Sequence, residues 1–147
     1  MPNVVVVGAQ WGDEGKGKVV DVLSPHVEAV VRFQGGNNAG HTLVVDGQRI
    51  VMHLVPSGIL RPSCVCVIGN GVVVDPDVLL GELEELGTLG HPVALGHLVV
   101  SLNAHVILPY HALLDRLREE SRGSVAIGTT RRGIGPSQGV PLASATA

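Results

Sequence analysis

Aromatic residues are almost absent from this chain, and positive charge is not in excess. The 147 residues include only Trp11, Phe33 and Tyr110 as aromatics, and the formal net charge is −3. Proteins that bind nucleic acids rely on basic surfaces and on aromatic side chains that stack against bases. The composition therefore excludes a nucleic-acid partner and favours small phosphorylated ligands.

Long uninterrupted hydrophobic runs are also lacking. Although 45% of the residues are hydrophobic and the mean hydropathy is +0.36, a glycine, a proline or a charge interrupts each apolar run before it reaches the length of a membrane span. The N-terminus has neither a basic stretch nor the apolar core of a signal peptide. We therefore expect a single-domain cytoplasmic protein that does not associate with membranes.

Cysteine is scarce, and the histidines show no metal-binding pattern. Cys64 and Cys66 lie two residues apart on one face of an expected strand, which suits neither a CxxC metal knuckle nor a mutual disulfide. We predict that both are buried thiols in the core. The seven histidines lack the spacing of metal ligands, and only His41 lies in a sequence context that indicates function.

The most informative segment is the run VVVVGAQWGDEGKGKVV at residues 4–20. Its four valines, Val4 to Val7, predict a strand covered on both faces of a parallel sheet. The glycines that follow allow positive φ angles and bring backbone N–H groups close to an anion, while Lys16 and Lys18 add positive charge. A helix is predicted from about Lys16, with the valines and leucine at 19, 20, 22 and 23 on its buried side, and the positive end of its dipole would point at the same place. The segment therefore predicts a phosphate site.

This segment matches neither common nucleotide-binding template completely. Residues 12–18 fit the G-x-x-x-x-G-K core of the phosphate loop, but Val19 stands where that motif needs a hydroxyl for magnesium. A Rossmann interpretation fails because Val20 replaces the third glycine. If magnesium accompanies the phosphates, the nearest replacement ligands are Asp13 and Glu14. The alternative is that these two carboxylates are solvated charges at the start of a helix.

Two further loops follow apolar runs and are rich in glycine and hydrogen-bonding groups. The run 27–33 ends in QGGNNAGHT, which could bind a base or a sugar or could form an ordinary surface turn. The run 125–127, which looks like a strand, leads into GTTRRGIGP at 128–136. Its threonines can donate to a phosphate, and Arg131 and Arg132 can pair with one; the alternative is a plain basic turn.

The rest of the chain alternates between predicted strands and helices. A hairpin is predicted around Asp46-Gly47, and strands are predicted at 64–68, 72–74, 99–102 and 106–108, with GNG closing the first of these. Asp75 is predicted to cap a helix that begins at Pro76 and ends at Gly87. Pro109 begins another helix, in which Leu113, Leu114 and Leu117 should face inward and the charged run should face water.

The segments GAQWGDEGKGK, QGGNNAGHT, HLVPSGIL, IGNGVVVDP and GTTRRGIGP together resemble the adenylosuccinate synthetase family. The resemblance runs nearly continuously over residues 3–136. It implies an α/β fold with a mixed, largely parallel sheet flanked by helices, related to the phosphate-loop NTPases. Residues 1–136 would be the N-terminal part of the nucleotide-binding ligase domain, and residues 137–147 an atypical, disordered tail that a frameshift or truncation could explain.

The resemblance also implies an activity and a set of ligands. Members of this family use GTP to join IMP to L-aspartate in purine nucleotide biosynthesis, through a 6-phosphoryl-IMP intermediate, and release GDP and phosphate. One Mg²⁺ per active site and a cytoplasmic homodimer are expected.

Residue roles follow from the same resemblance. Asp13 is expected to be the general base that removes the N1 proton of IMP, and to bind magnesium together with the carbonyl of Gly40. His41 is expected to be the acid partner that donates a hydrogen bond to the phosphoryl group. Contacts with GTP or IMP are implied for Gly12, Asp13, Glu14, Gly15, Lys16, Gly17, Lys18, Asn38, Ala39, Gly40, His41, Thr42 and Thr129.

Two departures from the family pattern limit this transfer. Arg131 replaces a glycine of the family's TTGRG, at a cost of about 1–3 kcal/mol if the position is left-handed. After GIGP the family's charged continuation is missing, and with it the aspartate-binding loop, the guanine-recognition residues and the arginine that reaches IMP in the partner subunit. We therefore expect an incomplete and inactive part of a ligase; the alternative is a non-catalytic module that binds GTP and IMP. A generic phosphate-loop kinase or switch GTPase is disfavoured by Val19 and by the lack of an N-K-x-D motif.

Overall fold

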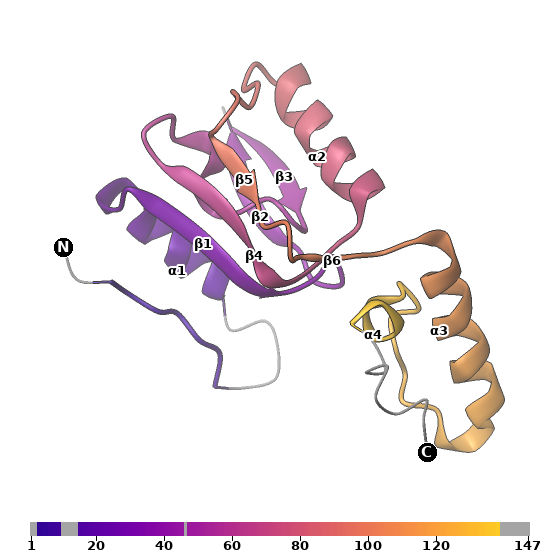
Figure 1. Cartoon of the computed structure of the whole chain (residues 1–147). Helices are drawn as coiled ribbons and strands as arrows, with labels where there is room; N and C mark the ends of the chain where they lie inside the picture. Colours follow the sequence, from indigo (N-terminus) through magenta and orange to yellow (C-terminus); the bar gives the residue numbers. More distant parts are fainter. Residues whose placement is uncertain (1–2, 10–14, 46, 139–147) are drawn as a thin grey trace.

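A computed structural model describes residues 3–9, 15–45 and 47–138 of the chain (Figure 1). The strands are β1 (Ala29–Gly35), β2 (His41–Val45), β3 (Gln48–Met52), β4 (Val65–Val74), β5 (Leu98–Val100) and β6 (His105–Val106). The helices are α1 (Lys16–Leu23), α2 (Pro76–Thr88), α3 (Pro109–Arg122) and α4 (Ile134–Ser137), with 3-10 turns at Ser24–His26, Ser57–Leu60 and Gly123–Val125. The predicted mixed α/β fold with a largely parallel sheet is confirmed.

The long strand β4 organises the sheet. It pairs in parallel with β1 on one edge, and with β5 and then β6 in parallel along its length. The hairpin of β2 and β3 is antiparallel and forms a separate two-stranded sheet. The inward side chains of β4, among them Cys66, Ile68 and Val72, are fully buried. Both cysteines are free and buried, as the sequence predicts.

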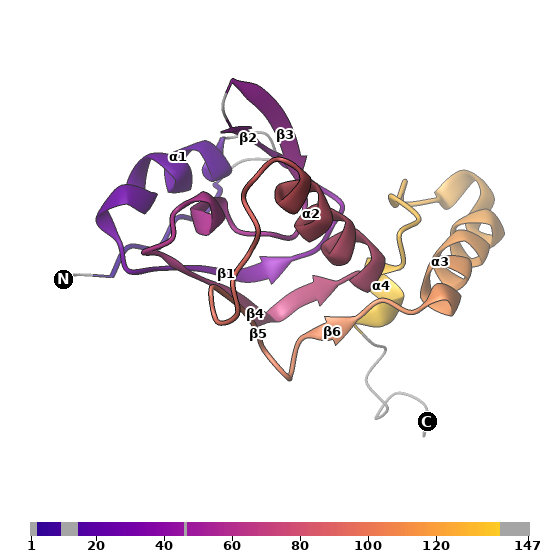
Figure 2. The ribbon, with the colours of Figure 1, turned by 90° about the horizontal axis from the view of Figure 1, so that it is seen from above.

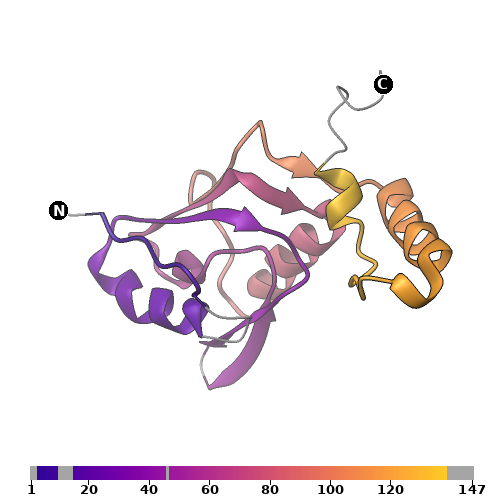
Figure 3. The same ribbon diagram turned by 90° about the horizontal axis from the view of Figure 1, so that it is seen from below.

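Helices α1 and α2 and the hairpin all lie on one face of the parallel sheet (Figures 2 and 3). The opposite face carries an apolar row in which Val31 pairs with Val67 and Val67 pairs with Val99. Val31 is 55% exposed and Val99 is 45% exposed. Parallel sheets are ordinarily covered on both faces. The described part of this chain covers only one face of its parallel sheet.

The predictions for the hairpin and α2 are confirmed. Residues 41–45 and 48–52 pair in register around the predicted turn, of which Asp46 lies outside the described residues. The carboxylate of Asp75 accepts hydrogen bonds from the N–H groups of Asp77 and Val78, which caps α2. The helix continues one residue past the predicted end at Gly87 and stops at Thr88.

The predicted strand at Val4–Val7 is wrong for the described structure. Residues 3–9 form no strand, and Val5 is 72% exposed. A strand needs a neighbour that satisfies its backbone groups, and β1, the nearest candidate in sequence, pairs only with β4 among the described strands. Helix α1 is where the sequence predicts it, but none of its residues is buried, so its valines do not form the expected inner face.

The glycines of GNG do not end the strand before them. Gly69 and Gly71 lie inside β4, where a Cβ added to Gly71 would clash with the carbonyl oxygen of Phe33 on β1. They allow two backbones to approach closely at a register shift between Arg32 and Gln34. In this strand glycine marks close packing and not a turn.

Helix α3 is oriented opposite to the prediction. His111, Asp115 and Glu119 are its buried residues, whereas Leu113 and Leu117 are about half exposed. The buried face packs against residues 128–133, whose backbone N–H groups need acceptors that leucine cannot provide. The predicted strand at 125–127 is also wrong, because Val125 ends a 3-10 turn and the next residues are irregular and exposed.

No helix within the described ranges has the length and apolar character to cross a bilayer; the longest, α3, has 14 residues.

Candidate nucleotide site

The N-terminus of α1 carries the described part of the glycine-rich loop. Gly15 caps the helix with φ 77°, a left-handed conformation that favours glycine. Lys16, Gly17 and Lys18 form the first turn, and the positive end of the helix dipole there attracts anions. Three predicted site residues, Gly12, Asp13 and Glu14, lie outside the described residues.

His41 lies at the first position of β2, opposite Met52 of β3. Its Nε2 atom is buried and has no hydrogen-bond partner in the described part of the chain. Burial lowers the pKa of His41 below its ordinary value of 6.5, and the charge of Arg32 lowers it further. The imidazole is therefore neutral at physiological pH, and its buried Nε2 atom makes no hydrogen bond with the described residues.

The helix turn and the histidine are in direct contact. A Cβ added to Gly17 would stand 2.7 Å from the Cβ of His41, closer than such atoms approach one another. Ser57 donates a hydrogen bond of 3.4 Å to the carbonyl of Gly17 and ties α1 to the turn that follows β3. The structure thus brings together two of the three predicted loops.

The third loop is held by buried carboxylates of α3. Asp115 accepts from the hydroxyl of Thr129 at 3.1 Å and from the N–H of Gly133 at 3.0 Å, and Glu119 accepts from the N–H of Gly128. Arg131 has φ 57° and is the only non-glycine residue with positive φ in the described ranges. The position that the family fills with glycine is therefore left-handed here.

Arg132 connects this loop to the loop between β1 and β2. Its guanidinium donates to the carbonyl of Asn37, and the side-chain amide of Asn37 donates to Asp75 at 3.0 Å. The Oδ1 atom of Asn37 is buried without a partner among the described residues. Of the basic pair in GTTRRGIGP, Arg132 is thus already engaged with the protein.

The predicted site residues differ in how closely they assemble. Gly17 and His41 touch, and Gly40 packs against His53. Asn38, Ala39 and Thr42 are exposed around them. Thr129, on the third loop, is bound to Asp115 of α3. Among the residues that the structure describes, no group of three His, Cys, Asp or Glu side chains could hold a metal ion.

Sequence reasoning missed the residues that hold these loops in place. Arg32 donates to the carbonyls of Gly36 and His53, and the buried carboxylate of Glu82 accepts from the backbone after β3. Burial lowers the pKa of Arg32, and the charge of Glu82 opposes that effect. One signal was available: Glu82 falls on the Leu79–Leu86 stripe of α2, where a carboxylate must find buried partners.

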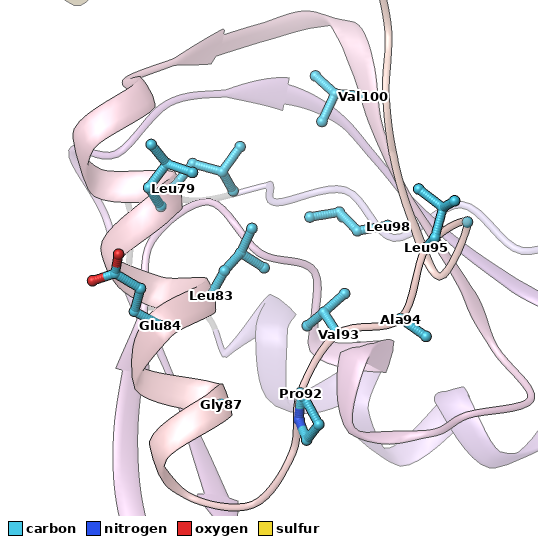
Figure 4. A pocket seen from close by; sticks show the side chains of 12 residues that line it. Leu79, Leu83, Glu84, Gly87, Pro92, Val93, Ala94, Leu95, Leu98 and Val100 are labelled. Atoms are coloured by element: carbon cyan, nitrogen blue, oxygen red, sulfur yellow. The ribbon is translucent and has the colours of Figure 1, made fainter.

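An open apolar pocket lies in a different part of the molecule. It has a volume of about 530 Å³ and lies between α2 and residues 92–100, with Leu79, Leu83, Val93 and Leu98 around it (Figure 4). Its lining is apolar except for Glu84. None of the predicted site residues lines it.

Comparisons with known proteins agree on one family. The adenylosuccinate synthetase family model matches residues 5–141. The adenylosuccinate synthetase of Myxococcus xanthus is 67% identical over 137 residues, which are 93% of this chain and 31% of that protein. The enzyme of the same name from Syntrophobacter fumaroxidans is 60% identical and is covered over 32% of its length.

Solved structures give the same result. The fully ligated adenylosuccinate synthetase of Plasmodium falciparum aligns with a TM-score of 0.76 and 42% identity, over 88% of this chain and 30% of that one. The succinoaminodeoxyadenylate synthetase of cyanophage S-2L, bound to dGMP and to dATP as an energy donor, aligns with a TM-score of 0.65 and 34% identity, over 88% of this chain and 35% of that one. The chain spans about a third of the length of the curated relatives it matches. By sequence and by fold, it belongs to the adenylosuccinate synthetase family.

Proposed function

We propose that this chain carries the phosphate-handling part of an adenylosuccinate synthetase site, which uses GTP to join IMP to L-aspartate. The observation that supports the proposal is the contact between Gly17 and His41. It puts a buried imidazole nitrogen, which has no partner among the described residues, beside the N-terminus of a helix whose first three residues are Lys-Gly-Lys. An anionic phosphoryl group would satisfy both features.

The chemistry assigns each group a step. Asp13 would take the N1 proton of IMP, so that O6 attacks the γ-phosphorus of GTP, and the bond to GDP would break. The amine of L-aspartate would then displace phosphate from the 6-phosphoryl-IMP intermediate. His41, neutral because burial lowers its pKa, would donate its Nε2–H to the phosphoryl oxygen as negative charge develops there. Phosphoryl transfer depends mainly on such positioning and charge stabilisation.

Magnesium would be held by the carboxylate of Asp13 and the carbonyl of Gly40. Hard cations prefer carboxylate and carbonyl oxygens, and Gly40 lies in an exposed irregular segment whose backbone a cation can reach. The ion, when bound, would neutralise the phosphate oxygens. The described residues hold no competing cluster of metal-ligating side chains.

Relatives three times as long carry further residues, so this chain would supply only part of the site. We propose that aspartate binding, guanine recognition and the arginine from a partner subunit depend on those residues, and that the complete enzyme is a cytoplasmic homodimer. The 147 residues alone would bind GTP and IMP without turnover. In that state the chain would be the non-catalytic binding module that the sequence leaves open.

Calorimetric titration of the purified chain with GTP and with IMP tests this function. We expect heat of binding for both ligands. We also expect a loss of GTP affinity in His41→Asn, since that variant lacks the Nε2 atom that would donate to the phosphoryl group. His105→Asn, which changes an exposed histidine on β6, is the matched control. No heat for either ligand would overturn the proposal. GTP hydrolysis that requires IMP and aspartate and is lost in Asp13→Ala would overturn the expectation of inactivity.

A further inference from the structure

Helix α2 contacts two segments next to the proposed site, the loop before β2 and the segment after β3. At its N-terminus Asp75 accepts from the side chain of Asn37, which lies in the loop between β1 and β2. Two turns later Glu82 extends to the segment that follows β3. The cap and the buried carboxylate thus act on the two ends of one structural unit, the loop and the hairpin that starts with His41.

Glu82 is buried and binds three consecutive backbone N–H groups. Its side chain accepts from His53, from Leu54 at 3.1 Å and from Val55 at 2.9 Å, and Oε1 lies 3.4 Å from Nδ1 of His53. A carboxylate that is only 5% exposed must be compensated by such donors. Three successive peptides are therefore held by one side chain.

The segment that Glu82 binds is connected to His41 through β3. Met52, which precedes residues 53–55, is the register partner of His41. The ring of His53 also packs on Gly40, because a Cβ added to Gly40 would stand 3.3 Å from Cδ2 and Nε2 of that ring. Two contacts thus lead from Glu82 to the Gly40–His41 pair.

Arg32 holds the same peptide from the other side. Its guanidinium donates to the carbonyl of His53 and, at 2.7 Å, to the carbonyl of Gly36. The N–H of His53 goes to Glu82 while the carbonyl goes to Arg32, so both polar groups of that residue are fixed. Arg32 in this way joins the start of the loop to the end of the hairpin.

From these contacts we propose that Glu82 is a positioning residue of the nucleotide site, because it fixes the end of β3 and thereby sets His41 against Gly17. The role in a nucleotide site rests on the proposed function, and the positioning of His41 rests on the contacts described above. Without the carboxylate, the 53–55 backbone would lose its acceptor and the Gly40–His41 pair would lose its support. The helix turn at Gly17 would then face a histidine that is free to move.

The test uses the whole 147-residue chain labelled with ¹⁵N and ¹³C. In the wild-type spectrum we expect Overhauser contacts between the His53 ring and Gly40 and between Gly17 and the His41 Cβ protons; their absence would overturn the inference. Glu82→Gln should shift the amide resonances of Gly17 and Gly40 and the ring signals of His41. Glu85→Gln, the same change at an exposed position of α2, should leave them in place.

A second arm separates a positioning role from a structural one. GTP titration should show at least a tenfold loss of affinity in Glu82→Gln, and partial recovery in Glu82→Asp, which keeps the charge on a shorter side chain. If Glu82→Gln does not fold, the Glu82→Asp spectrum carries the same test. Shifts confined to residues 53–55 with unchanged GTP affinity would overturn the inference. A wild-type chain that binds no GTP would instead overturn the proposed function.

Discussion

Replacement of Asp115 by alanine should release the loop at 128–133 from α3. Asp115 is buried, and its two oxygens accept from different groups: Oδ1 from the hydroxyl of Thr129 and Oδ2 from the N–H of Gly133. Alanine removes both acceptors at once. The N–H of Gly133, which is itself buried, would then lack a partner.

The expected magnitude follows from these two bonds. A hydrogen bond to a charged acceptor contributes about 1.5–3 kcal/mol. Because the loop lies at the surface and water can replace part of the loss, we take the lower value for each bond and expect about 3 kcal/mol. At about 1.4 kcal/mol for each factor of ten, the loop should open roughly 100 times more often.

Amide hydrogen exchange measures that opening. The amide of Ser137 is a suitable reporter, since it donates to the carbonyl of Gly133 and not to Asp115 itself. Its exchange should accelerate roughly 100-fold in Asp115→Ala, by the argument above. Glu120→Ala is the control, because Glu120 is more than half exposed and its contact with Arg116 is a surface ion pair of little worth. Equal exchange rates in the two variants would refute the reasoning.

Three further predictions concern single positions. Burial raises the pKa of the Cys66 thiol from its ordinary 9.0 to about 12, so native Cys66 should resist alkylation by iodoacetamide at pH 8, and rapid alkylation of the native protein in mass spectrometry would contradict this. Because the thiol ionises at lower pH in the unfolded state, the free energy of unfolding measured in urea should fall as the pH rises from 9 towards 12. Arg131→Gly should raise the free energy of unfolding by about 0.5–1 kcal/mol by removing left-handed strain, whereas an equal gain in Arg131→Ala would point to charge instead. Gly17→Ala should destabilise the fold by about 1–3 kcal/mol because the added Cβ would clash with His41. Gly81→Ala, in open space on α2, should stabilise the fold by up to about 1 kcal/mol. If the two variants shift the melting temperature in the same direction, the contact between Gly17 and His41 is excluded.

Local patterns predict those elements whose signals act within a few residues. The cap at Asp75 followed by Pro76, the pairing of residues 41–45 with 48–52 and the helix from Lys16 all follow from backbone chemistry that the sequence displays directly. Each of these elements stands where it is predicted, within a residue or so. The contact between Gly17 of α1 and His41 joins two segments that no local sequence pattern relates.

What the sequence does not predict is which partner each element finds. Four valines at residues 4–7 favour a strand, yet a strand exists only where another offers its backbone groups, and the described residues offer none there. The leucines of α3 favour an inward face, but the helix buries carboxylates because the neighbouring loop has free N–H groups. Glu82 was overlooked for the same reason, since its three backbone donors come from a segment about 28 residues away.

The inverted orientation of α3 has a consequence for how variants of this protein should be judged. In an ordinary amphipathic helix, substitution matrices treat leucine as the intolerant position and acidic residues as interchangeable. Along Pro109–Arg122 that ranking is reversed: Leu113 and Leu117 can become polar at little cost to the described fold, whereas Asp115 and Glu119 cannot. A deep mutational scan of this helix should therefore find substitutions at Asp115 and Glu119 more damaging than substitutions at Leu113 and Leu117.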